Sequence, residues 1–335
     1  MGNKIKIGIL GVGHLGKIHL NCLKDTDFEI IGFYDPDATN SREVEEKFSV
    51  KSFSDVDSLL EVTDAIIIAS PTITHFSLAR QCINAGKHLF IEKPVTEDVE
   101  EAIQLKTLMH AKGVIVQVGH VERFNPAYEV LAAHTKHPMF IEGHRLAMFN
   151  PRGTDVSVVL DLMIHDLDIV LSLVQSEIKD IRANGVKIVS DSVDICNVRL
   201  EFENGCVANL TASRISLKNM RKIRVFEKDA YINADFLEKK TTIVELEEWS
   251  SKDESAGGGE GLVIDTYIGR KKIKVNIPTI QANNAIRAEL ESFLLSISNN
   301  TAPLVGIEAG IKSLIVAKKI EEIIDNQLQN LNLEL

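Results

Sequence analysis

Short apolar runs alternate with amphipathic stretches through the first 120 residues. The apolar runs cover residues 5–10, 28–34, 64–69, 88–91 and 114–118. Helical spacing of apolar positions fills the intervals, at residues 17–24, 41–48, 74–85 and 97–111. Strands that alternate with helices form parallel sheets with right-handed crossovers. The pattern therefore predicts a doubly wound α/β domain of the Rossmann type over residues 1–120.

The pattern changes after Gly119. Asn125-Pro126 is typical of a helix start, and one long amphipathic helix is predicted over 158–174. Strand-like runs then follow one another at residues 178–188, 193–202, 206–213, 222–226, 241–246 and 272–277. An exposed loop at 250–261 and helices over 285–297 and 307–324 complete the chain. Residues 121–335 are thus predicted to form an α+β domain with a large, open, mostly antiparallel sheet.

A glycine-rich turn follows the first strand. The glycines lie at 11, 13 and 16, a helix candidate comes next, and Asp35 ends the second strand. This order is the dinucleotide-binding fingerprint, in which the glycines admit a pyrophosphate and the acid accepts ribose hydroxyls. Because the charge of Asp35 would repel a 2′-phosphate, NAD is favoured over NADP. The alternative is a glycine turn that binds no cofactor. The residues expected at the cofactor are Gly11, Gly13, His14, Leu15, Gly16 and Asp35.

Composition limits the class of protein further. The 335-residue chain has a net charge of -11, which argues against nucleic-acid partners and anionic membranes. Its four cysteines are scattered and form no C-x-x-C pair, as expected of buried thiols in a reducing compartment. No metal-binding spacing and no membrane-spanning apolar run is present in the sequence. We expect a cytoplasmic protein without a metal site.

Three further clusters follow the fingerprint in order. They are Ala69-Ser70-Pro71-Thr72-x-x-His75, Glu92-Lys93-Pro94 and Asp161-x-x-x-His165-x-x-Asp168. With the glycine turn, this arrangement resembles the glucose–fructose oxidoreductase, inositol dehydrogenase and MocA (Gfo/Idh/MocA) family across both predicted domains. The resemblance implies an NAD(P)-dependent dehydrogenase acting on CH–OH groups. It also implies a first domain that binds the cofactor and a second that carries the substrate site.

The resemblance assigns roles to three side chains. Lys93 would be the catalytic lysine, His165 would share proton transfer with it, and Asp161 would position substrate hydroxyls. Asp161 and His165 are four residues apart and would share one helix face. The alternatives are a surface lysine and a polar helix turn with a buried histidine. Met163 stands where the family often has glycine, which puts close substrate approach there in question.

The resemblance also extends the expected cofactor site. It adds Ser70, Pro71, Thr72, His75, Glu92, Lys93 and His120. His75 is alternatively an ordinary histidine on a helix surface. Pro94 holds Lys93 in an extended backbone conformation and permits a cis peptide.

A narrower resemblance concerns the substrate. Residues 119–127, together with 159–166, are similar to enzymes that oxidise the 3-hydroxyl of UDP-N-acetylhexosamines. A diphosphate would need cationic partners, for which the candidates are Arg123, Arg145, Arg152 and Arg214. These arginines alternatively form scattered salt bridges. Other functions of the same fold are oxidation of a free sugar or polyol, NAD-dependent redox glycoside cleavage and non-catalytic, nucleotide-sensing regulation. Because an open sheet leaves an apolar face, we expect a homodimer or homotetramer.

Overall fold

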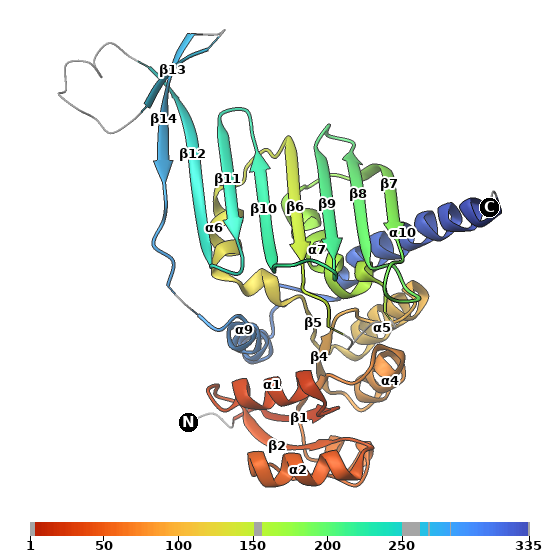
Figure 1. Cartoon of the computed structure of the whole chain (residues 1–335). Coiled ribbons are helices and arrows are strands. Elements are labelled where there is room, and N and C mark those ends of the chain that lie inside the picture. The colour runs from red at the N-terminus through yellow and green to blue at the C-terminus, as the bar shows by residue number, and fades with distance from the viewer. Residues whose placement is uncertain (1–3, 151–155, 250–261, 267–268, 282, 334–335) are drawn as a thin grey trace. The chain divides into compact units, whose positions relative to one another are not determined.

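The computed structural model describes residues 4–150, 156–249, 262–266, 269–281 and 283–333. The chain forms two compact units, shown in Figure 1. Unit 1 comprises Met1–Phe124 and Asn283–Val316, and unit 2 comprises Asn125–Ala282 and Ala317–Leu335. The sequence pattern predicts a single boundary after residue 120. The structure instead returns residues 283–316 to the first unit.

Unit 1 contains a parallel five-stranded sheet in the order β2-β1-β3-β4-β5. Its strands are β1 (Lys6–Leu10), β2 (Glu29–Tyr34), β3 (Ala65–Ile68), β4 (His88–Glu92) and β5 (Val116–Gly119). Its connecting helices are α1 (His14–Leu23), α2 (Ala38–Phe48), α3 (Val56–Leu60), α4 (His75–Asn84) and α5 (Val99–Lys112). The strand order reverses between β1 and β3, and ligands bind at the carboxyl ends of strands beside such a switch point. The predicted Rossmann sheet is confirmed.

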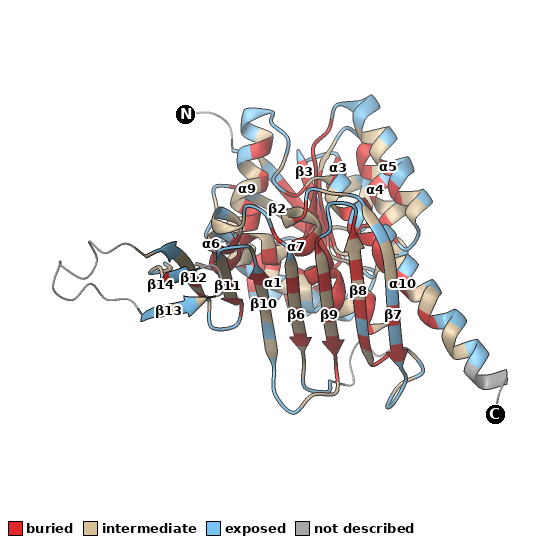
Figure 2. Cartoon of the chain, turned by 90° about the horizontal axis from the view of Figure 1, so that it is seen from above, coloured by how far each residue is buried: buried red, intermediate tan, exposed pale blue. Residues whose placement is uncertain are grey.

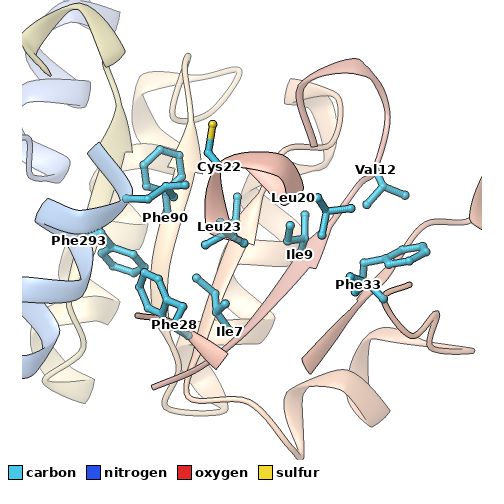
Figure 3. Close-up of a cluster of buried hydrophobic side chains, with 14 of the residues drawn as sticks. Ile7, Ile9, Val12, Leu20, Cys22, Leu23, Phe28, Phe33, Phe90 and Phe293 are labelled. Atoms are coloured by element: carbon cyan, nitrogen blue, oxygen red, sulfur yellow. The ribbon is translucent and has the colours of Figure 1, made fainter. Parts of the chain in front are cut away.

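Large apolar side chains fill the space between this sheet and α1 (Figure 3). Ile7 and Ile9 of β1 and Phe90 of β4 are fully buried there. Phe293 comes from α9 (Ala285–Asn299), more than 200 residues further along the chain than β4. Burial of a phenylalanine of this kind contributes about 1.5–3 kcal/mol of stability. This contact explains why part of the C-terminal region belongs to unit 1.

Two hydrogen bonds fix residues 283–316 to β5. The Val118 amide donates to the Val305 carbonyl over 2.9 Å. The Gln117 side-chain amide is buried and donates to the Glu289 carbonyl over 2.9 Å. Residues 283–316 therefore extend the first unit beyond its alternating strands and helices.

Unit 2 contains a nine-stranded sheet in the order β13-β14-β12-β11-β10-β6-β9-β8-β7. Six strands are β6 (Phe140–Leu146), β7 (Ile178–Val186), β8 (Ile195–Phe202), β9 (Val207–Ser213), β10 (Met220–Phe226) and β11 (Ala230–Asp235). The others are β12 (Lys240–Glu248), β13 (Leu262–Thr266) and β14 (Gly269–Asn276). Within this sheet, the described strands pair in antiparallel fashion except β6 and β9, which pair in parallel. The predicted, mostly antiparallel sheet is confirmed.

Buried and partly exposed residues alternate along the central strands of this sheet (Figure 2). Helices cover one face: α6 (Pro126–His134), α7 (Ile164–Leu173) and the part of α10 (Ile307–Leu333) that belongs to unit 2. Alternation of this kind is typical of a sheet with one face on a core. The sheet therefore provides a rigid support for the helices packed on it.

The predicted helix over 158–174 consists of two parts. Residues Val159–Met163 form a π-helical segment, and Ile164–Leu173 form the α-helix α7. π-Helical turns are rare and are found frequently at functional sites. Apolar periodicity does not distinguish such a turn from an ordinary helix, so the sequence predicted one continuous α-helix.

Candidate functional site

The glycine turn between β1 and α1 has the geometry that its sequence predicts. Gly11 adopts a φ of +87°, and a Cβ there would lie 2.7 Å from the Cα of Ser70. A Cβ on Gly16 would collide with the Gly11 carbonyl oxygen. A Cβ on Gly13 would meet no atom within 4 Å, so the turn is open on that side. The turn thus needs glycine at 11 and 16 for packing, whereas at 13 it leaves space beside the backbone.

The first turn of α1 has no side-chain cap. Its N-cap is Gly13, which has no side chain that could accept a hydrogen bond from the first-turn amides. In contrast, the N-cap residues of α2 and α6 are Asp37 and Asn125, whose side chains accept hydrogen bonds from first-turn amides. Uncapped amides at a helix N-terminus are suited to an anion such as a pyrophosphate. This end of α1, beside the open Gly13, therefore fits a dinucleotide cofactor.

Asp35 closes the same region from the end of β2. One carboxylate oxygen accepts the Val12 amide over 2.8 Å, and the other accepts the Asp37 amide over 3.0 Å. Asn40 donates to the Val12 carbonyl over 3.1 Å and so fixes the turn from the other side. The carboxylate is half-buried, and Oδ2 also accepts the Asn40 side-chain amide over 3.4 Å. Oδ1 has a second acceptor position. A hollow of about 310 Å³ beside it is lined by residues that include Asp35 and Arg42. Asn40 was not predicted to belong to this site.

The loop after β4 carries Lys93. The Lys93–Pro94 peptide is cis. The side chain of Glu92 accepts the Lys93 amide over 3.2 Å. On the opposite side of the loop, Nδ1 of His75 lies 3.0 Å from the Pro94 carbonyl oxygen. The backbone on both sides of Lys93 is therefore held by side chains, while Lys93 itself is only partly buried.

His75 differs from its expected role at the cofactor. It is 1% exposed, and its Nε2 lies 2.9 Å from the Ser70 carbonyl oxygen. Both ring nitrogens thus contact backbone oxygens, which joins the loop after β3 to the loop after β4. Burial lowers the pKa of this imidazole, although the two carbonyl contacts act in the opposite direction. These contacts give His75 a structural role between two loops.

The other residues expected near the cofactor lie along the same loops. Ser70 and Thr72 are half-buried and Pro71 is exposed, in the segment that leads into the short helix η1 (Thr72–Thr74). His120 follows β5 directly and is 1% exposed, with Nε2 3.0 Å from the Ser313 hydroxyl. Ser313 belongs to the segment that returns to unit 1, a contact that the sequence pattern did not predict.

In unit 2, Asp161 and His165 differ from their acidic neighbours in exposure. Asp161 lies in the π-helical segment and His165 in the first turn of α7, and both are half-buried. Asp166 and Asp168 are each only 3% exposed. A reactant from solvent can therefore reach Asp161 and His165 more readily than the two buried acids. The roles of Asp161 and His165 stay predictions.

Arg145 has a partner that the sequence did not predict. It lies on β6 and its guanidinium contacts the Asp166 carboxylate, with Nη2 2.7 Å and Nε 3.1 Å from Oδ1. The two side chains are 3% and 4% exposed. This buried ion pair joins β6 to α7 next to His165. It thus differs from the expectation that Arg145 faces a substrate phosphate.

Arg214 is also engaged within unit 2. Its guanidinium donates to the Val156 carbonyl and lies 3.9 Å from Asp194. Burial opposes ionisation of Asp194, but hydrogen bonds from the Ser190 hydroxyl and from the amides of residues 188–190 outweigh it and lower the carboxyl pKa to about 2. Arg214 therefore supports the chain just before the π-helical segment. Arg123 is half-buried in η2 (Val121–Phe124), whereas Arg152 lies outside the described residues.

The described ranges contain neither a candidate metal site nor a candidate membrane span. Within them, no group of three or more His, Cys, Asp or Glu side chains has an arrangement that can hold a metal ion. No helix in that part of the chain is both long enough and apolar enough to cross a membrane. All four cysteines are free and buried, as the sequence predicted.

Two family descriptions match the chain. "Oxidoreductase family, NAD-binding Rossmann fold" of the Gfo/Idh/MocA group matches residues 5–120, and the "GFO/IDH/MocA C-terminal domain" matches residues 129–232. The chain belongs to the Gfo/Idh/MocA oxidoreductase family. The first unit of this Gfo/Idh/MocA protein is accordingly an NAD-binding Rossmann domain, and the open glycine turn, the uncapped helix and Asp35 fit that cofactor.

Individual relatives extend the likeness to nearly the whole length. The UDP-N-acetylglucosamine 3-dehydrogenase of Acidithiobacillus ferrooxidans is 34% identical over 326 residues, 97% of this chain and 99% of that one. A crystal structure of the same enzyme is similar with a TM-score of 0.88 at 33% identity, covering 98% and 100% of the two chains. The myo-inositol 2-dehydrogenase of Thermotoga maritima is 25% identical, covering 95% and 97%. The protein is thus an NAD-binding oxidoreductase.

Proposed function

We propose that this oxidoreductase oxidises the 3-hydroxyl of a UDP-N-acetylhexosamine. The observation that carries the proposal is the similarity to the Acidithiobacillus ferrooxidans enzyme, which extends over 97% of this chain and 99% of that one. Support comes also from Lys93, Asp161 and His165, which are all partly exposed, whereas the residues adjacent to Lys93 and His165 in the chain are buried.

Lys93, His165 and Asp161 have distinct proposed roles. Lys93 or His165 removes the proton from the reacting hydroxyl, and Asp161 accepts hydrogen bonds from neighbouring hydroxyls of the sugar. NAD, when bound, accepts a hydride from the carbon that carries the oxidised hydroxyl. Glu92 and His75 hold the backbone around Lys93, so that its ammonium approaches from a fixed direction.

Two of the arginines proposed as partners of the diphosphate make buried contacts within the protein. Arg145 and Arg214 are buried in contacts with Asp166 and with Val156 and Asp194. Arg123 is half-buried on the segment after β5. We therefore propose that Arg123 contributes to phosphate binding, and that Arg145 and Arg214 act by supporting the helix that carries Asp161 and His165.

The test is turnover with defined substrates. Purified protein is incubated with NAD and UDP-N-acetylglucosamine, with an oxo-acid acceptor present, and both nicotinamide absorbance and sugar-nucleotide mass are followed. We expect the sugar nucleotide to lose two hydrogens. Lys93→Ala should lower turnover by about 10²–10⁴-fold, the range of general acid–base catalysis, without loss of NAD binding. Lys87→Ala is the matched control, because Lys87 precedes the same strand and donates to the Thr63 carbonyl.

The alternatives give different products. NADH formation with myo-inositol or a free sugar, but not with the nucleotide sugar, would replace the proposed substrate by a polyol or simple sugar. Release of free sugar would indicate redox-assisted glycoside cleavage. NAD binding without any turnover would favour a regulatory role. Unchanged turnover in Lys93→Ala would exclude Lys93 as a catalytic residue.

A further inference from the structure

A buried histidine contacts the motif that carries Lys93. His19 lies on α1 and has no exposed surface. Its Nε2 is 2.7 Å from Oε1 of Glu92, and its ring packs edge-on against Phe90, with 5.2 Å between ring centroids. Neither the glycine turn nor the Glu-Lys-Pro motif predicted this contact, because 73 residues separate the two side chains.

The Glu92 carboxylate is held on three sides. Oε1 contacts His19, and Oε2 accepts the Lys93 amide over 3.2 Å. A Cβ on Gly119 would lie 2.8 Å from Oε2, so the carboxylate occupies space that a glycine on β5 leaves. The residue is 8% exposed. A carboxylate so confined has few alternative positions while its hydrogen-bond donors remain.

The surroundings of His19 indicate which nitrogen carries the proton. Nδ1 is buried and has no hydrogen-bond partner among the described residues. A buried N–H without an acceptor is costly, whereas Nε2 has a carboxylate acceptor at 2.7 Å. The proton therefore belongs on Nε2, which donates to Glu92.

We infer that His19 is a positioning residue for Lys93. A continuous series of contacts runs from α1 through His19 and Glu92 to the Lys93 amide. The same helix begins at the open glycine turn that fits the pyrophosphate. One rigid connection thus fixes Lys93 relative to the cofactor-binding end of α1. The inference rests on the proposed function, since it takes Lys93 as the reacting group.

Loss of the His19 donor would free Glu92 and, through it, the Lys93 backbone. A misplacement of about 1 Å can cost about 10²-fold in rate. We expect His19→Leu to lower kcat by about 10–100-fold, with the KM for the sugar nucleotide and the Kd for NAD within about threefold of the unchanged protein. His19→Gln places an amide donor within reach of Glu92 and should restore most of kcat.

The matched control is Leu20→Ala. Leu20 is the next residue on α1 and is fully buried in the apolar core. This variant destabilises the same helix without touching Glu92, and we expect its kcat to stay within about threefold of the unchanged protein, by the same reasoning on misplacement. Glu92→Gln, which removes the charge that His19 contacts, is a second variant should His19→Leu not fold. It should lower kcat, as His19→Leu does.

A second readout needs neither cofactor nor substrate. The full-length protein without NAD is briefly treated with acetic anhydride, and acetylation of Lys93 relative to Lys24 is measured by peptide mass. We expect the ratio to change in His19→Leu and to return in His19→Gln. This readout tests the contacts from His19 through Glu92 to Lys93 even if no sugar nucleotide is turned over. A failure of this inference can therefore be distinguished from a failure of the proposed function. An unchanged ratio, an unchanged kcat in His19→Leu, or an equal loss in Leu20→Ala would overturn the inference.

Discussion

At the scale of single residues, Asp35 combines two roles in one side chain. It accepts the amides of Val12 and Asp37, and so shapes the glycine turn. We propose that it also accepts the ribose hydroxyls of NAD. The contact with the Val12 amide was not visible in the sequence, because Val12 and Asp35 become neighbours only when β1 and β2 pair.

Asp35→Asn separates these roles, because it keeps an acceptor oxygen and removes the charge. A hydrogen bond to a charged group contributes about 1.5–3 kcal/mol. We expect the preference for NAD over NADP, measured as a ratio of kcat/KM values, to fall by about 10–100-fold, the equivalent of that energy. Asp37→Asn, two residues away on the α2 cap, should leave the ratio unchanged. An unchanged ratio in Asp35→Asn would remove Asp35 from the ribose.

Residues whose roles depend only on the local backbone geometry behave as the sequence predicts. Gly11 and Gly16 have the packing constraints that the spacing predicts. Arg145 and His75 do not follow from the sequence, because their partners lie on other elements or loops. A charged residue type indicates that a partner exists, but the fold decides whether that partner is a substrate or another side chain.

At the scale of elements, the buried pair Arg145–Asp166 fixes α7 to the sheet. Replacement of Asp166 leaves a buried guanidinium without its main counter-charge. Breaking a buried pair in this way costs about 3–5 kcal/mol. We therefore expect Asp166→Asn to lower the free energy of unfolding by about that amount in urea denaturation.

The control for this prediction is an exposed pair in the same unit. Asp180 and Arg182 lie on β7 with side chains 45% and 71% exposed. Asp180→Asn should change the free energy of unfolding by less than about 1 kcal/mol. Equal effects of the two substitutions would mean that the Arg145–Asp166 pair contributes no more than a surface pair.

The elements predicted best are those with continuous apolar runs. The strands of the first sheet start and end within about two residues of their predicted limits, because strands buried on both faces are apolar throughout. β6 was missed because Glu142, His144 and Arg145 interrupt its apolar residues, and it pairs with β9 and β10 in the second sheet. β11 was missed as well. The π-helical segment before α7 has no distinguishing periodicity.

At the scale of the whole molecule, the sequence predicted two folds but not the path of the chain between them. The segment 283–316 returns to unit 1 through Phe293, Val305 and Ser313. These contacts join residues more than 150 positions apart, so periodicity within a short window carries no information about them.

We propose that the protein is a homodimer or homotetramer. Large apolar side chains are exposed on strands of the second sheet, including Phe226, Val263 and Val275 at 37%, 43% and 59% exposure. A second copy of the chain is one way to cover such residues. Light scattering should give two or four times the 37.1 kDa chain mass. A particle with the mass of one chain would contradict the proposal.

Isotope transfer from the sugar to the nicotinamide identifies the hydrogen that leaves the sugar. UDP-N-acetylglucosamine that carries deuterium on C3 is incubated with the protein and NAD, and both products are analysed by mass. We predict that deuterium appears in the reduced nicotinamide and is absent from the oxidised sugar nucleotide. Deuterium retained on C3 while the nicotinamide is reduced would show that another position is oxidised, and would contradict the account.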